Sequence, residues 1–449
     1  MKHHLAQTVE KQEAAVVVIN MKKLIPIFVF VLSLTTFGQS QKTDSLSRYK
    51  KRVLETTEVD FLMSYYTQDG NNAAVSGGIG TEKLTDITPT FVVAIPLNSD
   101  DVLTIDAGIS AYTSASSSNI NPFDSSKPAS PYSDSSGASA SDTWVNGNFS
   151  YAHSSDDRNN IVEGHLSVAS EYDYFSLGFG GSYTRLFNEK NTELSVKANV
   201  FLDTWNPQYP IELRPDFTNP NIVGTGVYNP FKYEAFTDES RNSYSISLSF
   251  SQILSKNFQA SVFIDVVQQN GLLSTPHQRV YFQDQPDFFI DDFQLADDVE
   301  RLPDTRFKIP IGARLNYFIN ERLTVRTYYR FYNDDWGINS HTASIELPFK
   351  ISDKFTVYPL YRYYTQTAAD YFAPYEAHLS TETFYTSDYD LSEFNSSQYG
   401  FGFNYTDIFA GAHIWKLGLK SIDFRYGYYD RSDGMHAHIA SVGFKFLLD

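Results

Sequence analysis

The sequence predicts an all-β protein, a single transmembrane antiparallel up-and-down β-barrel of about sixteen strands. Three observations lead to this prediction. Apolar and polar residues alternate over most of the chain, short and long connections alternate along it, and its last residues form an amphipathic strand. A mean hydropathy of −0.32 does not argue against such a barrel, because only one face of each strand meets lipid.

The alternation is clearest in 241–251, where every second residue from Ser243 is serine and the residues between are mostly apolar. In 322–331, Arg326 and Arg330 fall on the face opposite Val325 and Tyr329. Successive side chains of a strand point to opposite faces, so each segment has one polar and one apolar face. Strands are expected at 55–68, 85–98, 102–116, 142–154, 160–173, 175–187, 192–205, 240–254, 257–270, 306–319, 322–334, 340–351, 354–367, 397–408, 419–430 and 437–448.

The connections between these strands fall into two classes. Those after the even-numbered strands up to the twelfth are tight and rich in Asn, Asp and Ser, which favour turns. Long connections follow odd-numbered strands only, a regularity typical of short periplasmic turns and long extracellular loops. The connection at 409–418 is longer than this rule predicts. The long loops are expected at 69–84, 117–141, 206–239, 271–305 and 368–396.

The final expected strand carries Phe444, Phe446 and Leu448 on one face. Pairing of this strand with the first would close the barrel and leave no unpaired edge in lipid. We also expect the barrel-assembly machinery to recognise the chain through this strand. Aromatic pairs at strand ends, such as Tyr65-Tyr66, are expected to meet outer-membrane lipid and lipopolysaccharide at the interfaces.

The N-terminal region reads as a targeting segment. Lys22-Lys23 precede an apolar run at 24–34, and Thr36-Phe37-Gly38 then places small residues before a cleavage site, as in a secretory signal peptide. We therefore divide the chain into an upstream extension (1–20), a signal peptide (21–38), a short periplasmic segment (39–54) and an outer-membrane barrel (55–449). The expected location is the cell outer membrane.

Composition and motifs exclude several classes of function. The chain has no cysteine, which rules out disulfides, thiolate catalysis and Cys-ligated metal sites. A formal net charge of −18 argues against nucleic acid as a partner. No GxSxG, HExxH or phosphate-loop motif is present, so no catalytic residues and no enzyme activity are expected.

Charged residues on the polar faces are candidates for lining the lumen. They can form an ion-pair network that fills a narrow lumen, or a basic ladder beside an acidic one that orients small polar solutes. Both interpretations stay open. The candidates are Lys308, Arg314, Arg322, Arg326, Arg330, Arg362, Asp106, Asp203, Asp265, Glu346 and Asp423.

A metal site at the external mouth is a weaker hypothesis. No other cofactor is expected, but a divalent cation at the extracellular loops would suit their acidic residues. His436 and His438 have a spacing that can chelate a transition metal, although they share a face with lipid-facing Phe444. The candidate ligands are His341, His378, His436, His438, Asp334 and Asp335.

Several phrases in the second half resemble a known family. STPHQRVYF (274–282), RLPDTRFKIP (301–310), YYRFYNDDWGINSHT (328–342) and YPLYRYYTQTAADYF (358–372), with QDGNNAAVSGGIGTEKL (68–84), are similar to domain-of-unknown-function family 3570 (DUF3570). The resemblance implies an exported, barrel-like outer-membrane protein of Gram-negative bacteria, without an assigned activity. Family members are expected near lipoproteins and thioredoxin-like proteins, which suggests a link to envelope redox or metal handling.

Three hypotheses of function follow. The first is a porin-like channel that transports small polar solutes or ions. The second is a barrel plugged by its loops that binds a metal or a partner protein at its extracellular mouth. The third, an outer-membrane hydrolase, lacks any motif that singles out a nucleophile. The sequence leaves the solute and any protein partner open.

Overall fold

The computed structural model describes residues 51–113 and 142–448. The predicted upstream extension (1–20) and signal peptide (21–38) lie outside the described residues. So do most of the predicted segment 39–54, the predicted loop 117–141 and Asp449. Among the described residues, no helix is long and apolar enough to cross a membrane.

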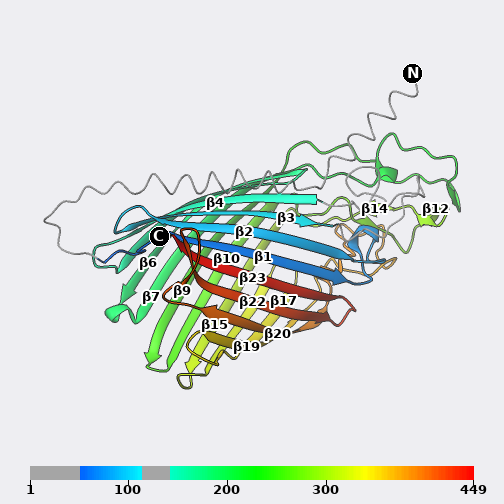
Figure 1. Cartoon of the computed structure of the whole chain (residues 1–449). Helices are drawn as coiled ribbons and strands as arrows, with labels where there is room; N and C mark the ends of the chain where they lie inside the picture. Colours follow the sequence, from blue (N-terminus) through cyan, green and yellow to red (C-terminus); the bar gives the residue numbers. More distant parts are fainter. Residues whose placement is uncertain (1–50, 114–141, 449) are drawn as a thin grey trace.

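Long antiparallel strands run around the molecule and follow the predicted boundaries to within a few residues (Figure 1). They are β1 (Glu58–Asp69), β2 (Leu84–Pro96), β3 (Asp101–Tyr112), β4 (Asp142–Ser154), β5 (Asn160–Ser170), β6 (Tyr174–Phe187), β7 (Thr192–Trp205), β9 (Glu239–Ser255), β10 (Phe258–Gly271), β15 (Thr305–Phe318), β16 (Thr324–Asp334), β17 (Asn339–Glu346), β18 (Phe349–Lys350), β19 (Phe355–Gln366), β20 (Phe394–Thr406), β21 (Ala412–Ile414), β22 (Leu417–Arg431) and β23 (His436–Leu448).

These eighteen segments make sixteen barrel strands, as predicted, because β18 and β21 are not separate strands of the barrel wall. β17 and β18 both pair with β19, so they are one strand interrupted at 347–348, where Pro348 cannot donate a backbone hydrogen bond. β21 pairs only with the start of β22 and lengthens the connection at 409–418 into a short hairpin. This hairpin accounts for the one connection that broke the predicted alternation.

The barrel is closed by its first and last strands. β1 pairs with β23 along its whole length, from Glu58 opposite Leu447 to Asp69 opposite His436. Figure 1 shows β1 in blue beside β23 in red. Closure satisfies every strand edge, which a sheet surrounded by lipid requires. The predicted role of the C-terminal strand in closing the barrel is therefore confirmed.

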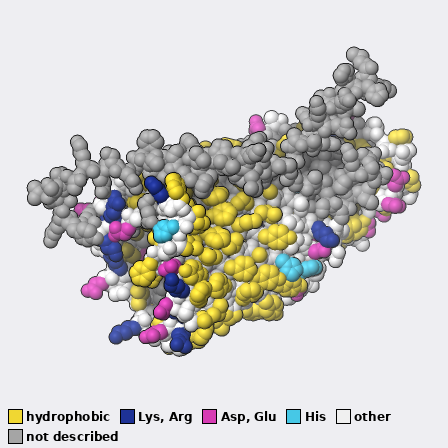
Figure 2. All heavy atoms as spheres, in the orientation of Figure 1, with side chains coloured by type: hydrophobic (Ala, Val, Ile, Leu, Met, Phe, Trp, Pro, Cys, Tyr) yellow, Lys and Arg dark blue, Asp and Glu magenta, His cyan; other side chains and the backbone are white. Residues whose placement is uncertain are grey.

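Side chains divide between the two faces of the barrel as the alternation predicted. Figure 2 shows a band of hydrophobic side chains over the outer surface, with charged residues gathered toward the ends. Phe149, Val162, Ile246 and Phe401 are about half exposed in this band. An apolar outside and a polar inside are the arrangement that a transmembrane barrel needs.

The two ends of the barrel differ. Tight connections such as 97–100 and 188–191 lie at one end, which we call the turn end. At the other, the loop end, four described loops pack together, and we call them the cap: 70–83, 206–238, 272–304 and 367–393. The cap contains only short elements: η2 (Ala74–Ser76), η4 (Ile211–Leu213), η5 (Tyr389–Leu391), β8 (Val223–Gly224), β11 (Arg279–Val280), β12 (Phe288–Ile290), β13 (Phe293–Gln294) and β14 (Asp298–Val299).

The cap spans the mouth of the barrel. Loop 70–83 follows β1, and loop 272–304 follows β10, which stands on the opposite side of the ring of sixteen strands. The two loops nevertheless touch, because Arg279 Nη1 donates to the Val75 carbonyl oxygen at 3.3 Å. Contact between loops from opposite walls is possible only across the opening.

The cap has hydrophobic cores of its own. One contains Leu213, Tyr281, Ala296 and Val299, drawn from loops 206–238 and 272–304. A second joins Phe288, Ile290 and Leu295. A third, of Leu273, Leu302 and Trp336, anchors the cap to the short turn between β16 and β17. Burial of this apolar surface holds the loops in one arrangement over the lumen.

Candidate functional site: a basic lumen beneath a cap

The strand registers place the predicted lumen residues on the inner face of the barrel. Arg314 stands opposite Tyr328, and Arg326 opposite Glu346, on neighbouring strands of one wall. Arg322 differs, because it lies in the turn between β15 and β16 and belongs to no wall strand. The residues on the inner face are Lys308, Arg314, Arg326, Arg330, Arg362, Asp106, Asp203, Asp265, Glu346 and Asp423.

The predicted cations of the inner face stand on one side of the lumen. β15, β16 and β19 carry all of them, since Arg322 lies in a turn, whereas Asp106 on β3 and Asp203 on β7 come from walls farther around the ring. Asp203 accepts a hydrogen bond from Tyr174 Oη at 2.5 Å, and Asp423 accepts one from Tyr358 Oη at 2.9 Å. In the described part of the chain, neither Asp203 nor Asp423 forms an ion pair with a basic side chain, and a tyrosine is the hydrogen-bond partner of each.

A lower cavity of about 610 Å³ lies along this wall, between Arg314, Arg326, Tyr328, Glu346 and Arg425. Glu346 accepts hydrogen bonds from Arg326 Nη1 at 2.9 Å and from Arg425 Nη2 at 3.2 Å. One carboxylate thus serves two guanidiniums. Arg314 packs over the Tyr328 ring, 5.8 Å from its centroid. The cavity has more positive than negative charge in its lining.

An upper cavity of about 350 Å³ lies closer to the cap. Arg330, Arg362 and Tyr364 line it from the barrel wall, and Asp390 and Leu391 line it from loop 367–393. The cap therefore supplies one side of this cavity and the barrel supplies the other.

Among the inner-face arginines that sequence reasoning missed, three stand on β15 and β22. Arg306 is paired with Asp334 at 2.5 Å beneath the cap, Arg425 binds Glu346, and Arg431 lies at the loop end of β22. Each stands an even number of residues from a predicted lumen residue on the same strand, so the two share a face; we call this having the same parity. Parity alone could have identified them.

A glycine makes room for the wall beside the lower cavity. Tyr358 is 5% exposed and lies across Gly402 on the neighbouring strand, where a Cβ would overlap the tyrosine ring. In this position the ring lies 5.2 Å from Arg425 Cζ, and the hydroxyl reaches Asp423. The small residue thus lets an aromatic ring lie flat along the wall and orient an arginine toward the lumen.

A buried ion pair joins two cap loops. Arg279 and Glu212 have side chains 1% and 0% exposed, and Arg279 Nε and Nη2 donate to Glu212 Oε1 and Oε2 at 2.6 and 3.1 Å. The geometry is a two-pronged guanidinium–carboxylate pair, which fixes direction as well as distance. This pair and the adjacent bond to Val75 tie loops 70–83, 206–238 and 272–304 together.

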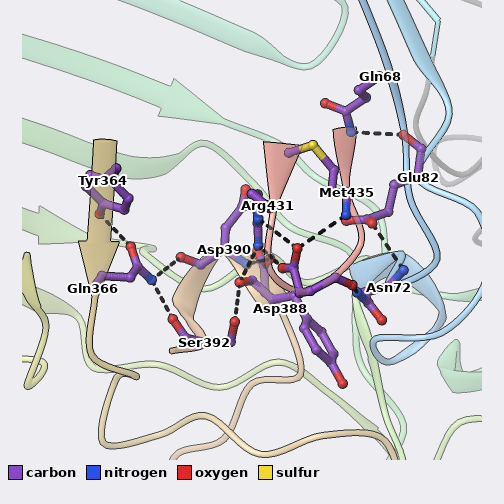
Figure 3. A network of polar contacts seen from close by, with 12 residues as sticks. Gln68, Asn72, Glu82, Tyr364, Gln366, Asp388, Asp390, Ser392, Arg431 and Met435 are labelled. Atoms are coloured by element: carbon purple, nitrogen blue, oxygen red, sulfur yellow. Dashed lines mark hydrogen bonds and ion pairs between the residues drawn. The ribbon is translucent and has the colours of Figure 1, made fainter. Parts of the chain in front are cut away.

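A second network holds loop 367–393 to the barrel (Figure 3). Arg431 is 4% exposed and donates to Asp390 Oδ1 at 2.5 Å, to the Tyr389 carbonyl oxygen at 2.8 Å and to Asp433 Oδ2 at 2.5 Å. Gln366 donates to the carbonyl oxygens of Asp390 and Ser392 from the other side. These bonds fix the segment around Asp390 and Leu391, which lines the upper cavity on its cap side.

The cap also buries acids. Glu300 is 3% exposed and accepts hydrogen bonds from the Thr275 backbone N–H at 2.6 Å and from Thr386 Oγ1 at 2.5 Å. Burial raises the pKa of Glu300 to about 8, and the charge of nearby Asp388 adds to this rise. Burial likewise raises the pKa of Asp388 to about 6. Burial thus favours the protonated form of both carboxyl groups.

The structure does not bring the predicted metal ligands together. His341 and His438 lie on the outer face, where their Nδ1 atoms contact Tyr329 Oη and Tyr426 Oη, each at 2.8 Å. His436 shares that face, and His378 is buried in the cap against Glu382. Asp334 binds Arg306, while Asp335 is exposed. Across residues 51–113 and 142–448, no group of three His, Asp or Glu side chains is arranged to hold a metal ion.

Solved structures of similar shape are outer-membrane proteins and channels by name. A bacterial polysaccharide outer membrane secretin shares 9% identity, with a TM-score of 0.44, over 87% of this chain and 98% of its own. The CymD monoaromatic hydrocarbon channel shares 9% identity, with a TM-score of 0.38, over 89% of each chain. Outer membrane protein OpdK from Pseudomonas aeruginosa shares 8%, with a TM-score of 0.37, over 87% of this chain and 99% of its own.

Sequence comparison is more specific than these structural similarities. A search among curated proteins found no match. The model of a family described as "Protein of unknown function (DUF3570)" matches residues 28–441, which include nearly all of the barrel and its cap. The resemblance noted in the phrases of the second half is confirmed, and the chain belongs to the DUF3570 family.

Proposed function

We propose that this protein is an outer-membrane channel for small polar solutes or ions, with its cap on the extracellular side. Long loops face outward and short turns face the periplasm in barrels of this architecture. The predicted signal peptide agrees with export to that membrane. β23, with Phe444 and Phe446 on its outer face, would present the barrel to the assembly machinery.

The observation that carries the proposal is the lining of the lumen. Polar and charged side chains cover the inner face, and the two cavities lie along one basic wall. A solid, ion-paired core would match each cation with a carboxylate. In the described part of the chain, Arg314, Arg330 and Arg362 form no ion pair. Unneutralised charge inside a barrel favours a wet, solute-accessible lumen.

Conductance of the purified protein in planar bilayers tests the proposal. We expect steady single-channel currents, and a changed reversal potential across a salt gradient in the Arg326→Ala/Arg330→Ala variant. Arg185→Ala is the matched control, because Arg185 is exposed near the turn end of β6. A folded barrel that stays silent both as wild type and with its cap loosened by Arg279→Met would contradict the proposal, and so would a selectivity that the two lumen substitutions leave unchanged.

The cap favours a second candidate, capture of a partner protein at the extracellular mouth. Its loops meet across the opening and have their own hydrophobic cores, which is more structure than an open pore needs. If this candidate holds, the wild-type barrel and a variant with a loosened cap, such as Arg279→Met, will both be silent in bilayers. Currents that appear only after the cap is loosened would favour a gated channel instead.

A further inference from the structure

Two arginines that line the upper cavity form no ion pair with the acid that shares it, Asp390. Across the described residues, Arg330 and Arg362 form neither an ion pair nor a hydrogen bond with another side chain. Arg330 Cζ lies over the Tyr332 ring, 5.9 Å from its centroid. Other arginines nearby are satisfied, because Arg306 binds Asp334 and Arg431 binds Asp390 and Asp433. The cavity thus holds two guanidiniums whose donors are available to a ligand.

The strand register brings these two arginines to the same place. β17 separates β16 from β19, with Thr342 opposite Arg330 and Ser344 opposite Arg362. Neighbouring strands are roughly 4.8 Å apart and Arg362 is offset from Arg330 by two residues along the strands, so the two backbone positions are separated by about 12 Å. Arginine side chains are long enough to meet over this gap, and the small residues between them leave room for a bound group.

The other surfaces of the upper cavity restrict what it can hold. Asp390 faces it from the cap, but its carboxylate is already bound by Arg431 at 2.5 Å. Ile338 and Leu391 add apolar surface. A volume of about 350 Å³ suits a small molecule. The planar fork of a guanidinium matches carboxylate and phosphate oxygens in two-pronged hydrogen bonds.

We propose that Arg330 and Arg362 form a binding site for a small oxyanion, a carboxylate or phosphate solute, at the capped end of the lumen. This inference rests on the proposed channel function and names its substrate class. A solute held here lies directly beneath loop 367–393, so movement of that loop would control its exchange with the outside. The lower cavity, with Arg314, Arg326 and Arg425 around Glu346, continues the same basic wall toward the turn end.

The test measures binding separately from conduction. Inorganic phosphate and succinate are titrated by calorimetry into the detergent-solubilised protein, with wild type compared with Arg330→Gln, Arg362→Gln and the double variant. Hydrogen bonds to charged groups are strong, so each single change is expected to raise Kd roughly tenfold or more. The matched control, Arg185→Gln, removes one arginine from the exposed surface near the turn end and is expected to bind like wild type.

Each outcome decides something. Binding of only one of the two probes supports the site and names its ligand as carboxylate or phosphate. If wild type binds neither probe, or the double variant binds as wild type does, the site is refuted even when the barrel conducts. Binding in a barrel that never conducts would retain the oxyanion site and refute the channel. Should a glutamine variant fail to fold, Arg330→Lys and Arg362→Lys keep the charge and lose the fork, and are expected to weaken binding by less.

Discussion

The Arg279–Glu212 pair provides the strongest test of the cap as a structural unit. Replacing Arg279 with methionine keeps a long side chain but leaves the Glu212 carboxylate buried, with the Ala296 N–H at 3.4 Å as its remaining donor. Removal of one partner from a buried pair costs about 3–5 kcal/mol, mainly because the other charge stays in a dry environment. Arg279 also loses its bond to Val75, which separates loop 70–83 from loop 272–304.

Hydrogen exchange of the cap amides, followed by mass spectrometry, measures this cost. A loss of about 3–5 kcal/mol corresponds to exchange faster by roughly two to four orders of magnitude, confined to the cap loops. Barrel strands should exchange as in wild type, because they are held by their own ladders. Arg185→Met, near the opposite end of the barrel, is the control and should leave cap exchange unchanged.

The double variant Arg279→Met/Glu212→Met tests whether the lost stability comes from the unpaired charge of Glu212. Replacing both partners with apolar side chains removes the unpaired buried charge, so the rate of cap exchange should fall most of the way back to the wild-type rate. The reasoning is refuted if Arg279→Met leaves cap exchange within a factor of about five of wild type, or if the double variant is less stable than both single ones.

Three further predictions concern the cap and its surroundings. The folded-state pKa of Glu300, about 8, lies above its ordinary 4.5, so its contribution to cap stability is complete below pH 4.5 and is lost as pH rises toward 8. After the intrinsic base-catalysed rise of amide exchange with pH is divided out, cap opening should therefore increase about tenfold between pH 6.5 and 8 in wild type and stay nearly constant in Glu300→Gln; equal pH profiles in the two proteins would refute the assignment. Arg431→Met should release loop 367–393, seen as new proteolytic cleavage within that loop while β22 and β23 stay protected; an intact loop would show that Gln366 alone holds it. Zinc titration should give the same result for wild type and for His341→Ala/His436→Ala, because both side chains stand apart on the outer face; weaker binding in the variant would restore the metal hypothesis.

The fold could be predicted almost entirely from the sequence. Alternation in 241–251 and 322–331 places serine and arginine on the inner face because a strand has a period of two, which needs no knowledge of neighbouring strands. The tight turns could be predicted from their Asn, Asp and Ser residues, and the long loops from the number of residues between expected strands. The predicted strands differ from the structure at three places: Arg322 lies in a turn, Pro348 interrupts a strand, and β21 adds a short hairpin.

The candidate site could be predicted only in part. Parity identified which charges face inward, including Arg330 and Arg362, but it could not say which of them are neutralised. Glu346 binds Arg326 and Arg425 because β16, β17 and β22 face the same stretch of lumen, a proximity that sequence spacing does not contain. The predicted histidine site failed for a related reason, since parity places His341 and His436 on the outside and His378 entered the cap core.

The sequence by itself determined the barrel, its inner and outer faces and its two unlike ends, because these depend on local alternation and on turn residues. Only the tertiary structure decided that the loops meet across the mouth. Arg279 finds Glu212 and Val75, and Arg431 finds Asp390, through closure of the barrel and packing of loops that are far apart along the chain. Those long-range contacts, rather than any local pattern, set which arginines remain unpaired in the lumen.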